Sequence, residues 1–343
     1  MLYKIVSIVG SLTFFSRILG YIRDLLIARV IGAGMISDCF FVAFKLPNLF
    51  RRLFGEGAMN AAFIPVISGI KSKSGLGRSD KFFSDIFSLL LIFLIFFVII
   101  AEICMPLIIT LIAPGFIFND SKFLLAVDLS RLAFPFVLFI CLTSLMGAYM
   151  NTLGKFASMA ITPIILNLTL IFALIIFFNV DNEILISRSL SLTISIAGLF
   201  QLIWMYFIIR RNQRILSVNL FSISNIYKRK EVKNFLVLLT PAIIGNGAYQ
   251  INLLIDMILA STLPDGSISY LYYADRINQL PLGVLGIAIS TALLPVLSLQ
   301  MKEKKSKKAN WTISSAIKIG IFLSFPAFIG LLILFLSLNS KNS

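Results

Sequence analysis

The chain is a succession of long apolar segments separated by short polar ones. Runs of about 20 mostly apolar residues are long enough to cross a bilayer as helices. The pattern predicts nine such spans, with turn-forming residues between several of them, as at Asn151–Gly154 and Pro264–Gly266. The predicted spans cover residues 4–31, 37–68, 82–113, 124–150, 157–179, 184–209, 234–262, 268–300 and 311–337.

The composition favours an all-α integral membrane protein. Hydrophobic residues make up 59% of the 343 positions and charged residues 13%, about half the charged content of roughly 25% in soluble domains. These values exclude an ordinary soluble domain, and they exclude disorder, which requires low hydrophobicity. The first apolar segment runs into Arg17, Arg23 and Asp24 without a small-residue cleavage site, so it is predicted to remain as a transmembrane helix.

Lys and Arg are distributed unevenly between the two sets of alternate loops. One set is strongly basic, whereas the other contains Lys122 as its single base. Because cytoplasmic loops collect Lys and Arg, the N-terminus is predicted to be cytoplasmic. The basic loops, which account for much of the net charge of +15, then need no partner beyond anionic membrane lipids, and no nucleic acid is predicted as a partner. The basic loops are 69–81, 151–156, 210–233 and 301–310, and the others are 32–36, 114–123, 180–183 and 263–267.

Two predicted spans resemble each other, which indicates an internal repeat. Residues 41–68 and 272–298 each contain an Ala followed two positions later by a base, and each ends in Pro-Val-x-Ser. They run in the same direction and lie six spans apart, so the repeat is parallel. The predicted domains are an N-terminal six-helix lobe at 1–230 and a partial C-terminal lobe at 231–343. A complete second lobe would need three more spans, so the sequence is expected to be a truncated gene product, a fragment, or a protein that works with less than its fold implies.

Several charged residues fall inside predicted spans, where each costs about 2.5–3.5 kcal/mol near the membrane centre. They are tolerated if they pair with one another or face a hydrated cavity. Arg17 and Asp24 share a helix face, and Arg52 and Glu56 are four residues apart, so both pairs are available. The seven bases are Arg17, Arg23, Arg29, Lys45, Arg51, Arg52 and Arg276, and the five acids are Asp24, Asp38, Glu56, Asp256 and Asp275.

The excess of arginine predicts an anionic ligand, because the planar guanidinium binds phosphate in a bidentate manner. The alternative is that these residues form structural ion pairs or lie near the membrane surface, as is favoured for Arg29. Gly55 and Gly57 are not followed by the Lys and Ser/Thr of a phosphate-binding loop, so no ATP site is predicted. The chain contains no histidine and no nucleophile–base pair that can be assembled, so neither a metal site nor an enzyme is predicted.

Three stretches carry a family resemblance. They are SRILGYIRDLLIARVIGAG at 16–34, DCFFVAFKLPNLFRRLFGEGAMNAAFIPV at 38–66 and YYADRINQLPLGVLGIAISTALLP at 272–295. Through them the chain resembles the MurJ (MviN) lipid II flippases of the multidrug/oligosaccharidyl-lipid/polysaccharide exporter superfamily. Shorter matches extend the resemblance over nearly the whole chain, at APGF (113–116), TPAIIG (240–245) and FPAFIG (325–330).

The resemblance implies a two-lobe transporter of a peptidoglycan precursor in the bacterial inner membrane. Its substrate would be lipid II, the undecaprenyl-diphosphate-linked disaccharide-pentapeptide, moved to the outer leaflet by alternating access through a cationic central cavity. Transport would be driven by membrane potential and ions, with no cofactor beyond a coupling monovalent ion of unassigned site, and the oligomeric state is left open. The residues implied for substrate binding are Arg17, Arg23, Arg51, Arg276, Asp38 and Asn48; those for salt bridges or gating are Asp24, Arg52, Glu56, Asp275 and Gln279.

The sequence also departs from the family pattern. Gln279 stands where the family commonly has Glu, which removes a carboxylate from any ion-coupling role there. The family has fourteen helices, and the last two, which form a groove for the lipid tail, have no counterpart among the nine predicted here. Two alternatives therefore stay open: another exporter of the superfamily, or a non-transporting remnant or scaffold. A drug exporter would need an acidic cavity, which the arginine excess disfavours.

Overall fold

The computed structural model is helical throughout its regular secondary structure, and no strand occurs among the described residues. The all-α prediction is therefore confirmed for that part of the chain. Two compact units, Met1–Tyr270 and Leu271–Ser343, are each described by themselves. The described residues are 2–52, 58–214, 216–218, 226–227, 229–276, 300, 308–318, 321–322, 325 and 329.

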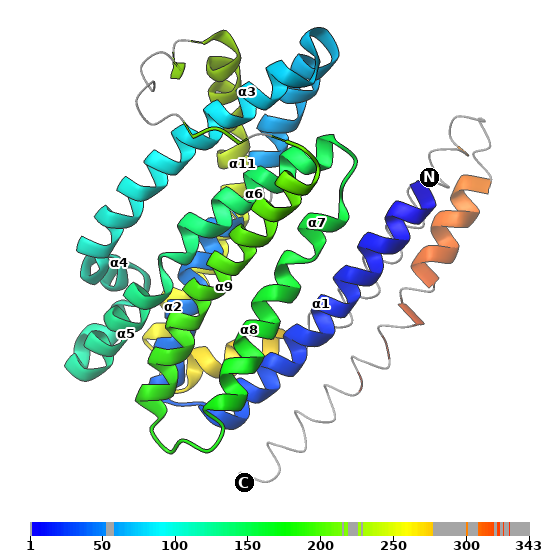
Figure 1. Ribbon diagram of the computed structural model, residues 1–343. Helices are drawn as coiled ribbons and strands as arrows, with labels where there is room; N and C mark the ends of the chain where they lie inside the picture. Colours follow the sequence, from blue (N-terminus) through cyan, green and yellow to red (C-terminus); the bar gives the residue numbers. More distant parts are fainter. Residues whose placement is uncertain are drawn as a thin grey trace. The chain divides into compact units, whose positions relative to one another are not determined.

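The first unit contains all the long helices of Figure 1 that carry labels. The last of them, α11, falls within this unit, and the chain begins a further helical stretch at Ser267. In order, the elements are α1 (Leu2–Val30), α2 (Met35–Phe50), α3 (Met59–Ile103), α4 (Met105–Ile112), the 3-10 helix η2 (Pro114–Phe118), α5 (Asp120–Ala133), α6 (Phe136–Thr152), α7 (Ala157–Ala160), α8 (Thr162–Ile176), α9 (Glu183–Arg211) and α11 (Lys230–Ser261).

Local sequence accounts for several helix starts. Asn119 and Asn182 precede α5 and α9, and their side-chain oxygens accept hydrogen bonds from the backbone N–H groups of Lys122 (3.2 Å) and Leu185 (3.0 Å). Such caps satisfy N–H groups that have no partner inside the helix. Proline stands in the first turn of α4 and α8, where its missing N–H does no harm.

Four helical segments among the described residues are long and apolar enough to cross a membrane. A fifth is obtained if the bent pair Lys230–Gly245 and Gln250–Ser261, which turns by 44°, counts as one span. The figure of nine spans stays a prediction. Helices α1 and α2, which cover most of the predicted spans 4–31 and 37–68, are not among these segments. Most of 268–300 and 311–337 lies outside the described residues. The four segments are Met59–Ile103, Asp120–Thr152, Ala157–Ile176 and Glu183–Arg211.

The predicted loop at 69–81 is helical instead. Helix α3 runs through it, and its one interruption is Gly75, with φ 77° and ψ −176°. Glycine reaches this left-handed φ without a steric penalty, so the chain changes direction there while helical turns continue on both sides (Figure 1). Polar residues end an apolar pattern without ending a helix, which is why hydropathy placed a loop at this point.

Aromatic side chains fill the interior of the first unit. Tyr149 of α6 stacks on Phe83 of α3 with ring centroids 4.3 Å apart, and both are fully buried. Gly198 of α9 faces Phe136 of α6, where an added Cβ would lie 2.7 Å from the ring. Small residues of this kind let membrane helices approach closely. Helix α6 is thereby held between α3 and α9.

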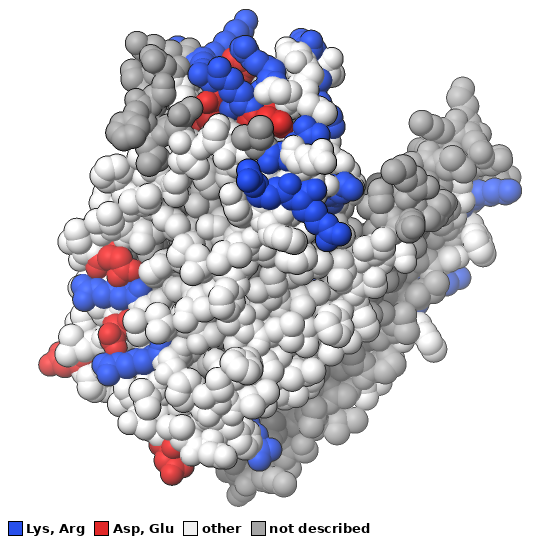
Figure 2. Space-filling model, in the orientation of Figure 1, with Lys and Arg blue, Asp and Glu red and all other residues white. Residues whose placement is uncertain are grey.

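The exterior of the unit has two chemical zones. Along the helices the exposed residues are mostly apolar, including Phe96, Phe172 and Phe207, which suits contact with lipid. Lys and Arg gather at the end where α3 bends and α9 ends (Figure 2), with Lys73 and Arg211 among the exposed bases.

Gly115→Ala is expected to loosen the contact between η2 and α11. The Gly115 N–H donates to Ser261 Oγ (3.2 Å), and a Cβ at this position would overlap the backbone of Ser261. Overpacking of this kind destabilises by about 1–3 kcal/mol. Thermal unfolding of the detergent-solubilised chain, followed by size-exclusion chromatography, should show a lower midpoint. The control is Gly69→Ala, where nothing lies within 4 Å; equal midpoints for the two variants would show that the close approach is unimportant.

Candidate functional site

Arg23 lies inside the first unit and belongs to a buried polar cluster. Its side chain is 4% exposed, and its Nε (2.9 Å) and Nη2 (2.7 Å) both donate to Oδ1 of Asp24, which is equally buried. Neighbouring residues on a helix point about 100° apart, and sequence spacing alone gave no reason to pair them. The long arginine side chain spans that angle.

The same guanidinium connects three helices. Nη1 of Arg23 donates to Oδ1 of Asn167 on α8 (2.8 Å), and its Cζ lies 5.2 Å from the ring centre of Phe44 on α2. Asn167 in turn donates to the backbone oxygen of Ser16 on α1 (2.9 Å). Charge, hydrogen bonds and the aromatic face together compensate the burial of the cation. Arg23 therefore holds α1, α2 and α8 together.

Arg17 differs from Arg23 although both lie on α1. Its side chain is half-buried, and it makes no hydrogen bond or ion pair to any residue that the structure describes. An arginine carries five N–H donors in a planar fork. Of the two α1 arginines in the predicted substrate site, Arg17 is the one whose donors are available to a phosphate group.

The end of α2 carries a second group of predicted site residues. Arg51 Nε donates to Oδ1 of Asn48 (3.2 Å), and Nδ2 of Asn48 donates to the backbone oxygen of Phe44 (2.8 Å). Asn48, Arg51 and Arg52 are all half-buried. Asn48 thus orients the Arg51 guanidinium at this end of α2. Glu56, the predicted partner of Arg52, lies outside the described residues.

Arg276 belongs to the second unit. Its Nε and Nη2 donate to the hydroxyl of Tyr272, at 3.3 and 3.0 Å, and its Cζ lies 5.2 Å from the centre of that ring. Arg276 is half-buried and Asp275 is exposed. Gln279 lies outside the described residues. Tyr272, one turn earlier on the helix, therefore fixes the direction of the Arg276 side chain.

Asp38 lies in a buried network of hydrogen bonds. It is 1% exposed, and its carboxylate accepts hydrogen bonds from the N–H groups of Gly266 (2.7 Å) and Ser269 (2.9 Å) and from the Ser269 hydroxyl (2.7 Å). Ser37 and Ser269 also share a hydrogen bond between their hydroxyls (2.8 Å). Asp38 therefore caps the helical stretch that begins at Ser267.

Lys122 adds a cation to this arrangement. Its Nζ lies 3.5 Å from Oδ2 of Asp38, 2.6 Å from Oδ1 of Asp265 and 4.2 Å from the ring centre of Phe116. The backbone oxygen of Lys122 accepts a hydrogen bond from the Cys39 thiol (3.3 Å). Three connections that are remote in the sequence meet here, namely the start of α2, the start of α5 and the turn after α11. We call Ser37, Asp38, Lys122, Asp265 and Ser269 the clasp.

The clasp uses residues that sequence reasoning missed. Lys122 was recognisable as unusual, because it is the single base in the predicted outer loops, but its position did not reveal its partners. Ser269 and Asn167 were less conspicuous, since each is only a polar residue in an apolar segment. Asp38 was assigned to the substrate cavity through the family resemblance, and that assignment stays a prediction.

The matching family model and the curated relatives carry the same family name. A model described as "Lipid II flippase MurJ" matches residues 27–338. The probable lipid II flippase MurJ of Rickettsia prowazekii (strain Madrid E) is 37% identical over 333 residues, which cover 97% of this chain and 64% of the relative. The protein of the same name from Rhizobium tropici is 39% identical over 331 residues, covering 95% of this chain and 60% of the relative.

Solved structures give the same fold. A lipid II flippase MurJ in an inward closed conformation superposes with a TM-score of 0.76 at 29% identity, over 95% of this chain and 65% of that one. An inward-facing MATE multidrug transporter of the MOP superfamily has a TM-score of 0.67 at 15% identity, so it shares the fold alone. This chain spans between 60% and 64% of the length of the two curated relatives. Because the family model matches residues 27–338, the chain belongs to the MurJ family of lipid II flippases.

Proposed function

We propose that the protein is a flippase that moves lipid II, the undecaprenyl-diphosphate-linked disaccharide-pentapeptide, from the cytoplasmic to the outer leaflet of the bacterial inner membrane. The observation that carries this proposal is the difference between the two arginines on α1: one is bonded within the protein, and the other has donors available for a ligand. Arg23 is engaged by Asp24 and Asn167, whereas Arg17 makes no polar contact to the described residues. Family membership supplies the substrate class.

In this proposal Arg17 and Arg23 have different roles. Arg17 contacts the diphosphate directly, because a half-buried guanidinium in a low-dielectric setting attracts phosphate strongly. Arg23 is a positioning residue that ties α1 to α2 and α8 and so fixes where Arg17 lies. Through the family resemblance, the further substrate-binding residues of the proposal are Arg51, Asn48, Asp38 and Arg276, and the residues proposed for salt bridges or gating are Asp24, Arg52, Glu56, Asp275 and Gln279.

The clasp supports alternating access. It joins the ends of elements that the sequence places on the outer side, with both oxygens of Asp38 saturated. A closed outer end leaves the opposite end open to substrate, and transport would require the clasp to separate. The gathering of bases at the other end of the unit (Figure 2) supports a cytoplasmic N-terminus. The proposal further includes anionic membrane lipids as partners and a coupling monovalent ion in place of ATP. It also includes an N-terminal lobe at 1–230 and a partial C-terminal lobe at 231–343.

Growth rescue tests the flippase proposal. The chain, expressed in bacteria depleted of their own lipid II flippase, should restore growth, and Arg17→Ala should abolish rescue because the donors for the diphosphate are lost. Arg29→Ala is the matched control: Arg29 is an exposed arginine of the same helix, whose Cζ lies 5.0 Å from the ring centre of Phe178. Immunoblots of membranes establish equal insertion. Failure of a well-inserted wild-type chain to rescue contradicts the proposal.

Arg23→Ala should act through stability. Removing one member of a buried ion pair costs about 3–5 kcal/mol, whereas replacing both members with apolar residues is often neutral. Arg23→Ala should therefore lower the thermal midpoint of the purified chain, and the double variant Arg23→Met/Asp24→Leu should regain most of it. An unchanged midpoint for Arg23→Ala would contradict the positioning role.

A disulfide across the clasp should arrest transport. In a background without the three native cysteines, Ser37→Cys/Ser269→Cys places two thiols where hydroxyls now lie 2.8 Å apart. Oxidation should block rescue, and reductant should restore it. Ser37→Cys alone is the control. Undiminished transport by a fully cross-linked protein would show that the clasp stays closed during the cycle.

A further inference from the structure

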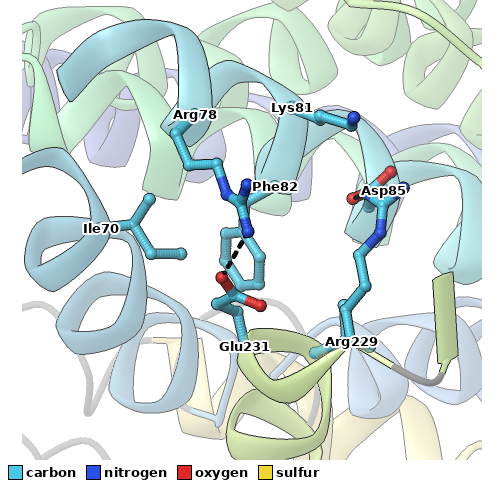
Figure 3. A pocket seen from close by; sticks show the side chains of 8 residues that line it. Ile70, Arg78, Lys81, Phe82, Asp85, Arg229 and Glu231 are labelled. Carbon is cyan, nitrogen blue, oxygen red and sulfur yellow. Dashed lines mark hydrogen bonds and ion pairs between the residues drawn. The ribbon is translucent and has the colours of Figure 1, made fainter. Parts of the chain in front are cut away.

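A small cavity opens at the basic end of the first unit, away from Arg17 and from the clasp. It lies between α3, beyond the bend at Gly75, and the first turn of α11 (Figure 3), with a volume of about 140 Å³. Roughly 10–15 Å³ is enough to hold one water molecule, so the space admits a larger polar group. Its polar lining consists of Arg78, Lys81, Asp85, Arg229 and Glu231.

The cations of this cavity keep most of their donors free for a ligand. Nη2 of Arg78 binds Oε1 of Glu231 (3.0 Å), and Nη1 of Arg229 binds Oδ2 of Asp85. Each guanidinium has five N–H donors, and these bonds use one of each. Lys81 is exposed and makes no hydrogen bond or ion pair to residues within the described ranges. Three cations against two carboxylates leave the lining positive.

The start of α11 adds to the attraction for an anion. Arg229 is its N-cap and makes no side-chain cap hydrogen bond, and Glu231 and Val232 of the first turn line the cavity. The N-terminus of a 32-residue helix carries partial positive charge, which favours anions nearby. The Glu231 carboxylate already accepts a hydrogen bond from its own backbone N–H in this turn, so the helix contributes by its partial charge. Helix and side chains thus favour the same kind of ligand.

The remaining wall of the cavity is apolar. Ile70, Phe82 and Val232 form it, and Phe82 and Val232 are buried. Inorganic phosphate gains nothing from such a wall, whereas a phospholipid can place its glycerol and first methylene groups against it while its phosphate meets the cations. The basic end of a membrane-spanning bundle also lies at the level of lipid headgroups.

We propose that this cavity binds the phosphate headgroup of an anionic membrane phospholipid, and we call it the headgroup pocket. The lipid is distinct from the transported substrate, and the site stands apart from the proposed flippase activity. A bound phosphate would connect Lys81 and Arg78 of α3 with Arg229 at the start of α11. It would therefore strengthen the docking of α11 on α3, two segments that are more than 140 residues apart in the chain.

Native mass spectrometry of the full detergent-solubilised chain tests the proposal. Phosphatidylglycerol is titrated in, with phosphatidylcholine as the zwitterionic comparison. Lys81→Glu is the test variant, because it reverses a charge in the pocket without breaking either ion pair. Lys73→Glu is the matched control, an exposed lysine of the same helix that does not line the cavity. Equal thermal midpoints of the two variants without added lipid confirm that both are folded.

We expect Lys81→Glu to weaken phosphatidylglycerol binding about tenfold and Lys73→Glu to change it less than about twofold, since a pocket charge acts at hydrogen-bonding distance while a remote surface charge is screened. A parallel titration with inorganic phosphate should give no retained adduct. An equal loss in both variants would overturn the proposal in favour of diffuse surface charge. Equal binding of the two lipids, or retention of inorganic phosphate with displacement of the lipid, would also overturn it.

Discussion

Charge that is buried among membrane helices must be neutralised where it lies, and this constraint organises the first unit. Arg23, Asp24 and Asn167 satisfy one another between α1, α2 and α8, and the clasp does the same where α2, α5 and the turn after α11 meet. Each cluster joins elements that are distant in the sequence. The apolar helices supply the bulk of the packing, and the polar clusters add specific contacts between particular helices.

Much of this architecture could be predicted from hydropathy. The all-α class, the apolar segments around 124–150, 157–179 and 184–209 and the basic character of one end all follow from patterns along the chain, because a bilayer imposes a length and a polarity on each span. The prediction of a loop at 69–81 was wrong, because a polar stretch indicates solvent exposure and does not show where a helix ends. The resemblance in residues 16–34 and 38–66 identified the family correctly.

The partners of the charged residues could not be predicted, because they depend on contacts between remote segments. Sequence spacing made Arg17 and Asp24 available to each other, yet the ion pair seen is between adjacent residues, Arg23 and Asp24. Sequence spacing also gave no sign that Asp38 lies in the clasp with Lys122 and Ser269. The headgroup pocket could not be predicted from the sequence either, because its cations come from both α3 and the start of α11.

We propose above all that this chain moves a diphosphate-linked lipid across a bilayer. Purified chain reconstituted into liposomes with a fluorescent undecaprenyl-diphosphate-linked disaccharide tests it most directly, since dithionite added outside quenches only the outer leaflet. With the protein present and a membrane potential imposed, all of the fluorescence should be lost, while a fluorescent polyprenol that lacks the diphosphate should be quenched only in the outer leaflet. Quenching of the diphosphate lipid no greater than in protein-free liposomes would contradict the claim.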